Sequence, residues 1–200
     1  MKLTRALIAS MVFTVVLLGI YYSHVNFFKV NVVFYAAIGD GVVAAFMTGV
    51  ILQFLPYFRV FGGFEKLQLV VIWLLFGYSF AISVPTVIDR SLSFYILEKL
   101  QQRGGGIKQD SFEQVFTQEY VKEHHLVDVR LTEQLQSGTI AINDGCVTLT
   151  EKGQMIASFG RFFRTHWLPK QRLLMGKYSD TLTDPFRNSV ANVDYTCQRR

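Results

Sequence analysis

The chain has 200 residues, half of them of hydrophobic type, and a formal net charge of +5. The apolar residues gather in three long stretches within residues 1–88, and this distribution excludes an ordinary soluble globular protein. The basic surplus lies at the other end. Residues 161–200 hold eight basic and three acidic residues, whereas residues 108–160 hold four basic and eight acidic ones.

Each apolar stretch is long enough to cross a membrane as a helix. Residues 6–28 and 67–88 contain no Asp, Glu, Lys or Arg, and residues 32–54 contain only Asp40. At a rise of about 1.5 Å per residue, such a stretch spans the ~30 Å hydrocarbon core. Backbone groups in lipid must be satisfied internally, and the alternation typical of barrel strands is absent, so we expect three transmembrane helices over residues 1–88.

The first stretch has an alternative interpretation, a cleaved signal peptide. Lys2 and Arg5 precede an apolar run, as in such peptides. The run is long, however, and no small-x-small cleavage site follows it. We therefore expect an uncleaved span.

The second stretch carries a small residue at every fourth position: Ala37, Gly41, Ala45 and Gly49. This spacing places the four residues on one ridge of a helix and lets another helix approach closely. Chance is the alternative, because Gly and Ala are common in membrane helices. The regular spacing favours a packing ridge, whose partner is the first or third span of this chain or a helix of another protein.

Asp40 lies beside this ridge and well inside the span. An ionised carboxylate at that depth is costly unless it is paired or hydrated. Two interpretations stay open. One is a polar contact with a partner helix or part of a substrate or ion path. The other is a protonated side chain that is hydrogen-bonded to a hydroxyl group or to a freed carbonyl group near Gly39 and Gly41. Because the three stretches hold no Asp, Glu, Lys or Arg besides Asp40, the sequence argues against a proton relay and a transporter.

A second domain is expected over residues 89–165. Apolar residues at helical spacing alternate with glycine stops, and two short apolar runs flank the turn Asn143-Asp144-Gly145, which is a strong hairpin signal. In chain order we expect a helix over 91–103 that Asp89 caps, a helix that begins at Asp110 and Ser111, a helix over 127–136, strands over 139–142 and 146–149, and a helix from Thr150.

This order of elements resembles the winged-helix superfamily. The closest match runs from Ser137-Gly138-Thr139-Ile140 to Leu149-Thr150-Glu151-Lys152-Gly153, which is similar to the wing and the exit from the wing in many winged-helix proteins. The resemblance implies the fold of residues 89–165 and leaves the function open.

A winged helix implies DNA binding, but the charges argue against it. A DNA-reading helix and wing need cations that displace counterions from the phosphates. The expected reading helix and the segment before it hold two basic and three acidic residues: Lys122 and Arg130, against Glu123, Asp128 and Glu133. The wing turn adds Asp144. We therefore expect a protein-binding domain and no nucleic acid, with a membrane-tethered DNA-binding regulator as the alternative.

No catalytic or metal-binding pattern stands out, and we expect neither a metal nor a cofactor. His124 and His125 are adjacent, so on a helix their side chains diverge by about 100° and bind one metal poorly; we expect a polar turn there. Cys146 and Cys197 have no zinc spacing. They pair if they face an oxidising compartment and are free thiols in the cytosol.

Residues 166–200 form a basic aromatic tail whose pattern begins within the preceding helix. Interleaved aromatic and basic side chains are typical of a helix at the lipid headgroup boundary. The expected membrane-surface residues are Arg161, Arg164, Trp167, Lys170 and Arg172. Phe159 and Phe163 are expected to face inward, and the chain after Met175 is expected to be extended or bound to a partner.

The orientation in the membrane is nearly balanced by the positive-inside rule. Each side carries four basic residues: Lys2, Arg5, Arg59 and Lys66 on one, and Lys29, Arg90, Lys99 and Arg103 on the other. The N-terminus slightly favours the first set as cytosolic. We nevertheless expect a cytosolic C-terminal domain on an inner or cytoplasmic membrane, because winged helices are mostly cytosolic and the tail suits an anionic leaflet.

These features predict a membrane α-helical region followed by a small α+β winged-helix-like domain. The expected function is that of a non-enzymatic accessory or scaffold subunit. It packs against a larger membrane protein through the ridge, contacts membrane lipids, and uses the domain for protein–protein interaction. A small membrane enzyme or carrier that uses Asp40 is a further alternative.

Overall fold

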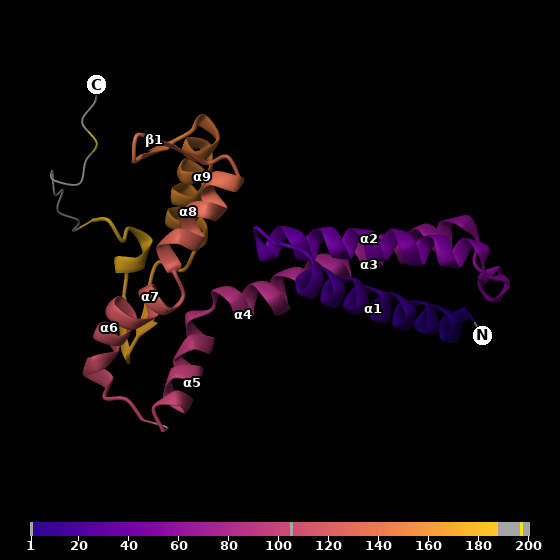
Figure 1. Cartoon of the computed structure of the whole chain (residues 1–200), viewed down its shortest axis with the longest axis horizontal. Coiled ribbons are helices and arrows are strands. Elements are labelled where there is room, and N and C mark those ends of the chain that lie inside the picture. Colours follow the sequence, from indigo (N-terminus) through magenta and orange to yellow (C-terminus); the bar gives the residue numbers. More distant parts are fainter. Residues whose placement is uncertain (1, 105, 188–196, 198–200) are drawn as a thin grey trace. The chain divides into compact units, whose positions relative to one another are not determined.

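The computed structural model describes residues 2–104, 106–187 and 197. The described chain is mostly helical and contains two small antiparallel sheets of two strands each (Figure 1). It divides into two compact units, Met1–His124 and His125–Arg200, which are described separately.

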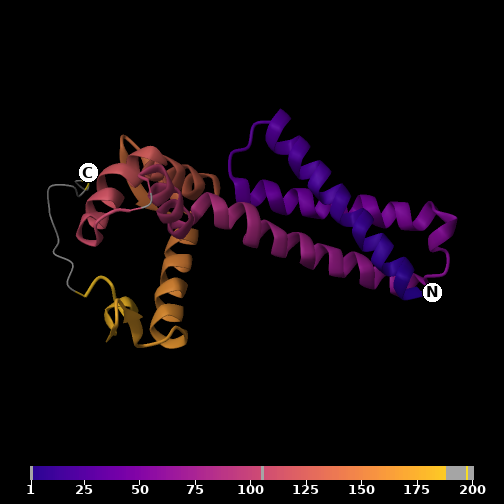
Figure 2. The same cartoon turned by 90° about the horizontal axis from the view of Figure 1, so that it is seen from below.

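The first unit begins with three long apolar helices, as the sequence predicts. Each is long and apolar enough to cross a membrane, which is compatible with an integral membrane protein. Figures 1 and 2 show the three as one bundle. They are α1 (Lys2–Phe27), α2 (Val33–Phe54) and α3 (Gly63–Ala81).

The third span continues beyond α3 without a break. A π-helical turn (Ile82–Thr86) leads into α4 (Val87–Arg90). Pro85 lies within this turn, where the altered hydrogen-bond ladder accommodates its ring and its missing N–H. The cap expected at Asp89 is wrong: Asp89 lies inside α4, and Ser91 caps the next helix by accepting from the N–H of Phe94 at 3.4 Å.

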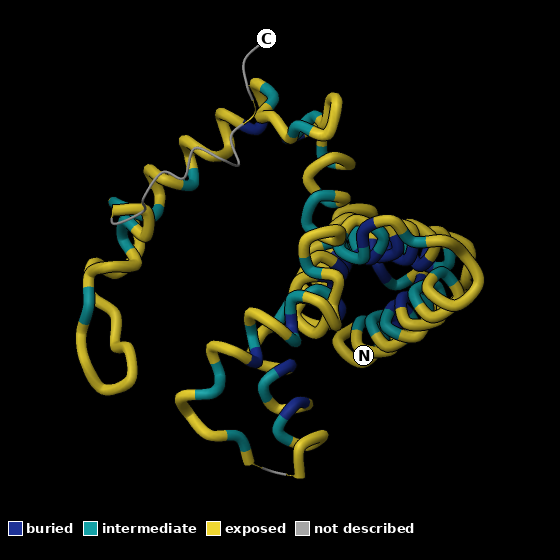
Figure 3. The backbone as a smooth tube through the Cα atoms, turned by 60° about the vertical axis from the view of Figure 1, so that its left-hand side comes forward, coloured by how far each residue is buried: buried dark blue, intermediate teal, exposed yellow. Residues whose placement is uncertain are grey.

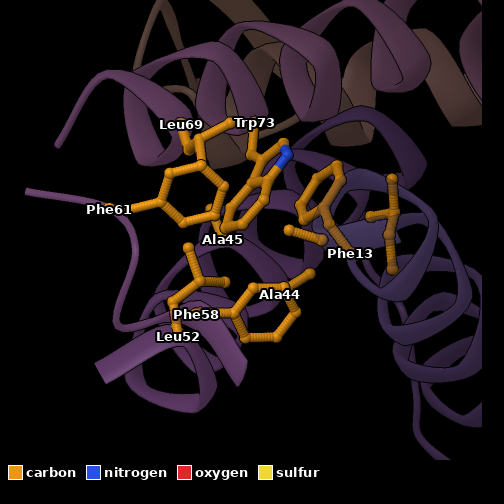
Figure 4. Packing of buried hydrophobic residues seen from close by; sticks show 10 residues of the cluster. Phe13, Ala44, Ala45, Leu52, Phe58, Phe61, Leu69 and Trp73 are labelled. Carbon is orange, nitrogen blue, oxygen red and sulfur yellow. The ribbon is translucent and has the colours of Figure 1, made fainter. Parts of the chain in front are cut away.

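Aromatic side chains fill the centre of the bundle (Figure 4). The Phe13 ring of α1 stacks on the Trp73 indole of α3, with 5.4 Å between the ring centroids. The indole N–H donates to Ser10 Oγ at 3.1 Å, so the polar end of Trp73 is satisfied inside the bundle. Ala44 and Ala45 of α2 belong to the same cluster and are fully buried. Their small side chains leave room for the two rings. Figure 3 shows buried residues gathered along these helices.

Polar contacts join α1 to α3 and to the connection that precedes it at one end of the bundle. A short helical turn (Pro56–Phe58) follows α2. Arg5 Nη1 donates to the carbonyl oxygen of Tyr57 at 2.8 Å, and Lys2 Nζ pairs with Glu65 Oε1 at 2.8 Å. The N-terminal end of α1 therefore lies beside the connection between α2 and α3.

Shorter helices complete the first unit. The rings of Tyr95 and Tyr120 pack with their centroids 4.6 Å apart and so join the two helical segments on which they lie. The first segment is α5 (Leu92–Gln102), and the second is a continuous run of a 3₁₀ turn (Gln109–Ser111), α6 (Phe112–Gln114), a π-helical stretch (Val115–Tyr120) and α7 (Val121–Glu123).

The second unit contains the expected hairpin between two helices. Asp144 and Gly145 form its two-residue turn with φ angles of 51° and 76°, the left-handed pair that a type I′ turn requires. Thr150 caps the following helix, because its Oγ1 accepts from the N–H of Gly153 at 3.1 Å. The elements are α8 (Leu126–Gln136), β1 (Ile140–Asn143), β2 (Cys146–Leu149) and α9 (Glu151–Trp167).

A second hairpin lies where the sequence predicts an extended chain. β3 (Arg172–Leu174) pairs with β4 (Lys177–Ser179), and a 3₁₀ turn (Thr181–Thr183) follows. Its turn consists of Met175 and Gly176, both left-handed. Because Met is an unusual first residue of such a turn, the hairpin signal is weak. As far as residue 187, the chain after Met175 therefore contains one extended strand and a 3₁₀ turn, and binding to a partner stays a prediction. Residues 188–196 and 198–200 lie outside the described residues.

A winged helix over residues 89–165 is not confirmed. The expected elements occur in the expected order, but the boundary between the two units lies at His124. The unit boundary therefore places α5 to α7 in the first unit, and α8, the β1–β2 hairpin and α9 in the second. The expected start at residue 89 also falls inside the continuous helix of the third span.

Candidate functional site

The ridge of small residues is covered by the chain's own third span. Ala37, Gly41 and Ala45 are buried, and Gly49 is half-buried. A Cβ on Gly41 would lie 3.1 Å from the Cα of Gly77 on α3. In the described structure, the partner of this ridge is therefore α3, one of the partners that the sequence leaves open.

An ionic or hydrogen-bonded pair links α1 to α2 beside this ridge. His24 Nδ1 lies 2.7 Å from Asp40 Oδ1, and Asp40 retains only 5% of its exposure. His24 occupies the last turns of α1, and Asp40 lies two turns into α2. The short connection between these helices folds α2 back along α1, so the two side chains meet across the helix–helix contact. The partner of Asp40 Oδ1 is an imidazole on another helix of this chain, and not the hydroxyl or freed carbonyl group near the glycines that one interpretation predicts.

The second oxygen of Asp40, Oδ2, is buried and has no hydrogen-bond partner among the described residues. The pair opens on a cavity of about 560 Å³ between α1 and α2. The remainder of the lining consists of Val16, Gly19, Ile20, Ser23 and Phe28. The site therefore presents Asp40 Oδ2 as an acceptor, together with the Ser23 hydroxyl, in a groove that is otherwise mostly apolar.

His24 is the functional candidate that sequence reasoning missed. It lies in a stretch counted as uncharged, since a neutral histidine adds no formal charge. With His24 beside Asp40, the spans do hold a second group that can carry charge, and this removes one reason for setting a carrier aside. The signal available in the sequence is the spacing: two polar residues that flank one short helix connection come to the same depth in an antiparallel pair.

A second polar cluster lies in the short helices of the first unit. The buried Lys99 of α5 contacts Glu119 Oε2 and Glu123 Oε1, each at 2.6 Å. The Tyr95 hydroxyl donates to Glu123 Oε2 at 3.0 Å. These contacts tie α5 to the helical run that ends at α7, so we interpret the cluster as structural. His124 packs its ring against Tyr95 and Tyr120 and ends that run, as the expected turn implies.

The ionisable groups of this cluster shift one another's pKa values. Hydrogen bonds with Glu119 and then Glu123 raise the pKa of Lys99 above its ordinary range. The ammonium group of Lys99 is the main cause that lowers the pKa of Glu119 and of Glu123. Burial, followed by the hydrogen bond to Glu123, raises the pKa of Tyr95. All four groups therefore favour the state in which Lys99 is a cation and both glutamates are anions.

The expected membrane-surface residues lie at the end of α9 and after it. Arg161, Arg164 and Trp167 belong to the last turns of α9, Lys170 follows the helix, and Arg172 begins β3. Arg164 is half-buried and the other four are exposed, Trp167 at 71%.

Two phenylalanines of α9 differ from expectation. Phe159 and Phe163 are 65% and 43% exposed, so the expected inward packing is wrong for the described structure. The physical reason is the contact that α9 makes. Only Gly153, at its first turn, is fully buried, against the carbonyl group of Thr139 and the Leu149 side chain.

A disulfide bond joins Cys146 of β2 to Cys197, with 6.0 Å between the Cα atoms. Of the two states that the sequence leaves open, the structure has the oxidised one. Within the described residues no group of three or more His, Cys, Asp and Glu side chains is placed to hold a metal ion.

Comparisons of the chain with protein-family models, with curated proteins and with solved structures found no match.

Proposed function

We propose that this protein is a non-enzymatic membrane subunit and that the groove at Asp40 receives a helix of a larger membrane protein. One observation carries the proposal: the buried carboxylate of Asp40 is bound to His24 through Oδ1 only, and Oδ2 has no partner among the residues that the structure describes. A buried acceptor without a donor is costly in lipid. A partner helix with a hydroxyl or amide donor removes that cost.

The groove replaces the ridge as the proposed interface. The sequence favours the row from Ala37 to Gly49, but α3 covers Gly41 and the Val70 side chain lies against Gly49. The groove offers mostly apolar walls for a partner's side chains, and Asp40 Oδ2 and the Ser23 hydroxyl for its polar groups. Close packing and interhelical hydrogen bonds both contribute to helix association in membranes.

Copurification tests the proposal. The tagged full chain, extracted in mild detergent, is expected to bring down a stoichiometric membrane partner. Asp40→Leu is expected to lose that partner, and Asp40→Asn to keep part of it, because the amide retains an acceptor oxygen. Leu75→Ala is the matched control, since Leu75 is exposed on α3 and does not line the groove.

The proposal fails if the parent chain purifies alone, or if Asp40→Leu retains the partner as well as the parent does. Thermal unfolding of each variant in detergent separates loss of the partner from loss of the bundle. A variant that melts as the parent does but loses the partner supports the groove as the interface.

A small membrane carrier or enzyme that uses Asp40 is a second candidate, and His24 is the observation that favours it. A His–Asp pair can bind and release a proton or a cation, and it lies in an open cavity. Asp40→Asn distinguishes the two candidates. A carrier loses transport with this variant even when every partner is retained, whereas a subunit with the partner retained keeps its phenotype.

Protein binding by the part of the chain after the spans belongs to the same proposal. The winged-helix resemblance supports it, and so does the charge of α8. Its single basic residue, Arg130, donates to Glu133 Oε2 at 2.8 Å, so that cation is already neutralised. We expect no salt-sensitive binding of duplex DNA by the full chain; tight binding that weakens steeply with salt would favour the DNA-binding alternative.

We also propose on which side of the membrane the second unit lies. Cytosolic placement rests on the fold resemblance and the basic tail. The Cys146–Cys197 bond supports the opposite side, because disulfides persist in oxidising compartments. The count of basic residues is equal on the two sides, but the position of Lys2 and Arg5 at the N-terminus agrees with this placement, and we favour it. A C-terminal reporter that works only outside the cytoplasm is expected to be active. An inactive reporter would support the cytosolic placement instead.

A further inference from the structure

We infer that the second unit contains a binding site for a phosphate group, formed by Arg161, Arg164 and Arg187. A cavity of about 700 Å³ lies between one face of α9 and the segment of residues 183–187. Its volume falls within the range of about 300–1,000 Å³ that is usual for small-ligand sites. Both walls belong to the same unit, and the site is independent of the groove at Asp40.

Helical spacing brings the polar residues of α9 to this cavity. Gln154, Ser158 and Arg161 follow one another at intervals of four and three, and Arg164 lies three residues further on. Such intervals place side chains on one face of a helix. The opposite wall supplies Arg187, so three guanidinium groups from two segments line one cavity.

These arginines have donors to spare. Each guanidinium carries five N–H donors. Arg187 Nη1 donates to Asp180 Oδ2 at 3.2 Å, and the guanidinium of Arg164 lies 6.0 Å from the ring centroid of Phe186. For the Arg161 side chain the described residues provide no acceptor within hydrogen-bond distance. The cavity therefore has unused donors that point to an anionic ligand.

The charge and the spread of the donors select the class of anion. Three arginines line the cavity against two carboxylates, Asp184 in the lining and Asp180, which pairs with Arg187, so one positive charge remains. A carboxylate ligand has only two acceptor oxygens, whereas a phosphate group has more of them and can accept from guanidinium groups on both walls at once. Planar guanidinium groups bind phosphate through paired hydrogen bonds. Ser158 and Gln154 add neutral donors.

The apolar rim fits a phosphate that is attached to an apolar group. Leu149 is 58% exposed and Phe186 is 72% exposed, and both line the cavity. Phosphate is the chemistry that the lining recognises, and it has two sources, a lipid headgroup and a free phosphate compound. The test distinguishes them.

The disulfide bond holds the site together. Cys146 lies before α9 and Cys197 lies after the segment that carries Arg187, so the bond closes one covalent loop that contains both walls. Reduction of this bond is therefore expected to weaken phosphate binding.

Isothermal calorimetry on the full chain in detergent tests the site. The probes are inorganic phosphate, a short-chain phosphatidic acid and, as a carboxylate control, acetate. Arg161→Gln and Arg164→Gln are each expected to weaken phosphate binding about tenfold, because each removes charged hydrogen bonds to the anion. Lys170→Gln and Arg172→Gln remove the same charge outside the cavity and are expected to change binding less than about twofold.

Binding of phosphatidic acid alone assigns the site to a lipid headgroup, and binding of both phosphate probes assigns it to the phosphate group itself. Equal losses in all four variants would show general attraction to a basic surface and would overturn the inference. The inference would also be overturned if neither phosphate probe bound. Arginine modification by phenylglyoxal in the unaltered chain gives a second readout. Phosphate is expected to protect Arg161 and Arg164 and not Arg172; equal protection of all three would also overturn the inference.

Discussion

Gly41 on α2 and Gly77 on α3 touch backbone to backbone: a Cβ built on either would lie 3.1 or 3.0 Å from the Cα of the other. No side chain separates the two helices at this point. Because helices in lipid gain little from the hydrophobic effect, such close packing contributes much of their association. The contact also fixes which face of α2 is turned to α3 and which is left to α1, and so fixes where Asp40 can point.

Gly77→Ala is expected to destabilise the bundle by about 1–3 kcal/mol, because the new methyl group meets backbone that cannot rotate away. Unfolding of the full chain in mixed detergent measures the change. Gly39→Ala is the matched control, since a Cβ there meets nothing within 4 Å. Equal stability of Gly77→Ala and the parent would contradict the close contact.

The cluster around Lys99 makes the first unit sensitive to acid. Folding lowers the pKa of Glu119 and of Glu123, so their contribution to stability is fully present above the unfolded pKa, near 4.5, and is lost as the pH falls through the lower folded values. The raised pKa of Lys99 adds stability that is lost only at strongly alkaline pH. Melting temperature against pH is therefore expected to fall below about pH 4.5.

The double variant Glu119→Gln and Glu123→Gln is expected to melt lower than the parent at neutral pH and to show a flatter acid limb. Both carboxylates are partly exposed, so solvent screens the effect and it is expected to be modest. Glu98→Gln is the control, because Glu98 is exposed and makes no contact with the Lys99 ammonium among the described residues. An unchanged acid limb in the double variant would exclude these two groups as its cause.

Two glycines of α9 are expected to respond in opposite directions to the same substitution. Gly153→Ala is expected to cost about 3 kcal/mol or more, because the methyl group would clash with the carbonyl group of Thr139. Gly160→Ala meets nothing within 4 Å and is expected to stabilise the helix by about 0.5–1 kcal/mol. Thermal unfolding of the two variants side by side measures both changes. Similar effects of the two would contradict the packing of Gly153 against the hairpin.

Cys146→Ser is expected to lower the stability of the second unit by about 4 kcal/mol, from the chain entropy of a loop with a sequence separation of 51 residues. Cys197→Ser is expected to give the same loss, since either change opens the same bond. Unfolding under non-reducing conditions measures it, and reductant is expected to bring the parent to the level of the variants. If reductant left the stability of the parent unchanged, the bond would be shown not to form in solution.

Properties that depend on neighbouring residues in the chain were predictable from the sequence. The three spans follow from uncharged stretches of membrane length, and the β1–β2 hairpin follows from the turn at Asp144 and Gly145. The cap at Thr150 follows from the same local chemistry. In each case backbone geometry and side-chain type decide the outcome within a few residues.

Properties that depend on how helices turn toward one another were not predictable. The partner of the ridge stayed open because Gly41 alone does not show whether Gly77 or another protein lies opposite. The pairing of His24 with Asp40 needs the rotation of two helices about their axes. The contact of Lys99 with Glu123 joins residues on separate helices, and no local pattern marks it.

The bond between Cys146 and Cys197 changes the covalent connectivity of residues 146–197. By sequence, residues 166–200 are a tail that is attached through α9. With the bond in place, α9 and the β3–β4 hairpin lie on a ring that starts and finishes at the first hairpin. A single protease cut within that ring would separate no fragment until a reductant was added, so ordinary proteolysis would make this part of the protein look more resistant than its exposed surface implies.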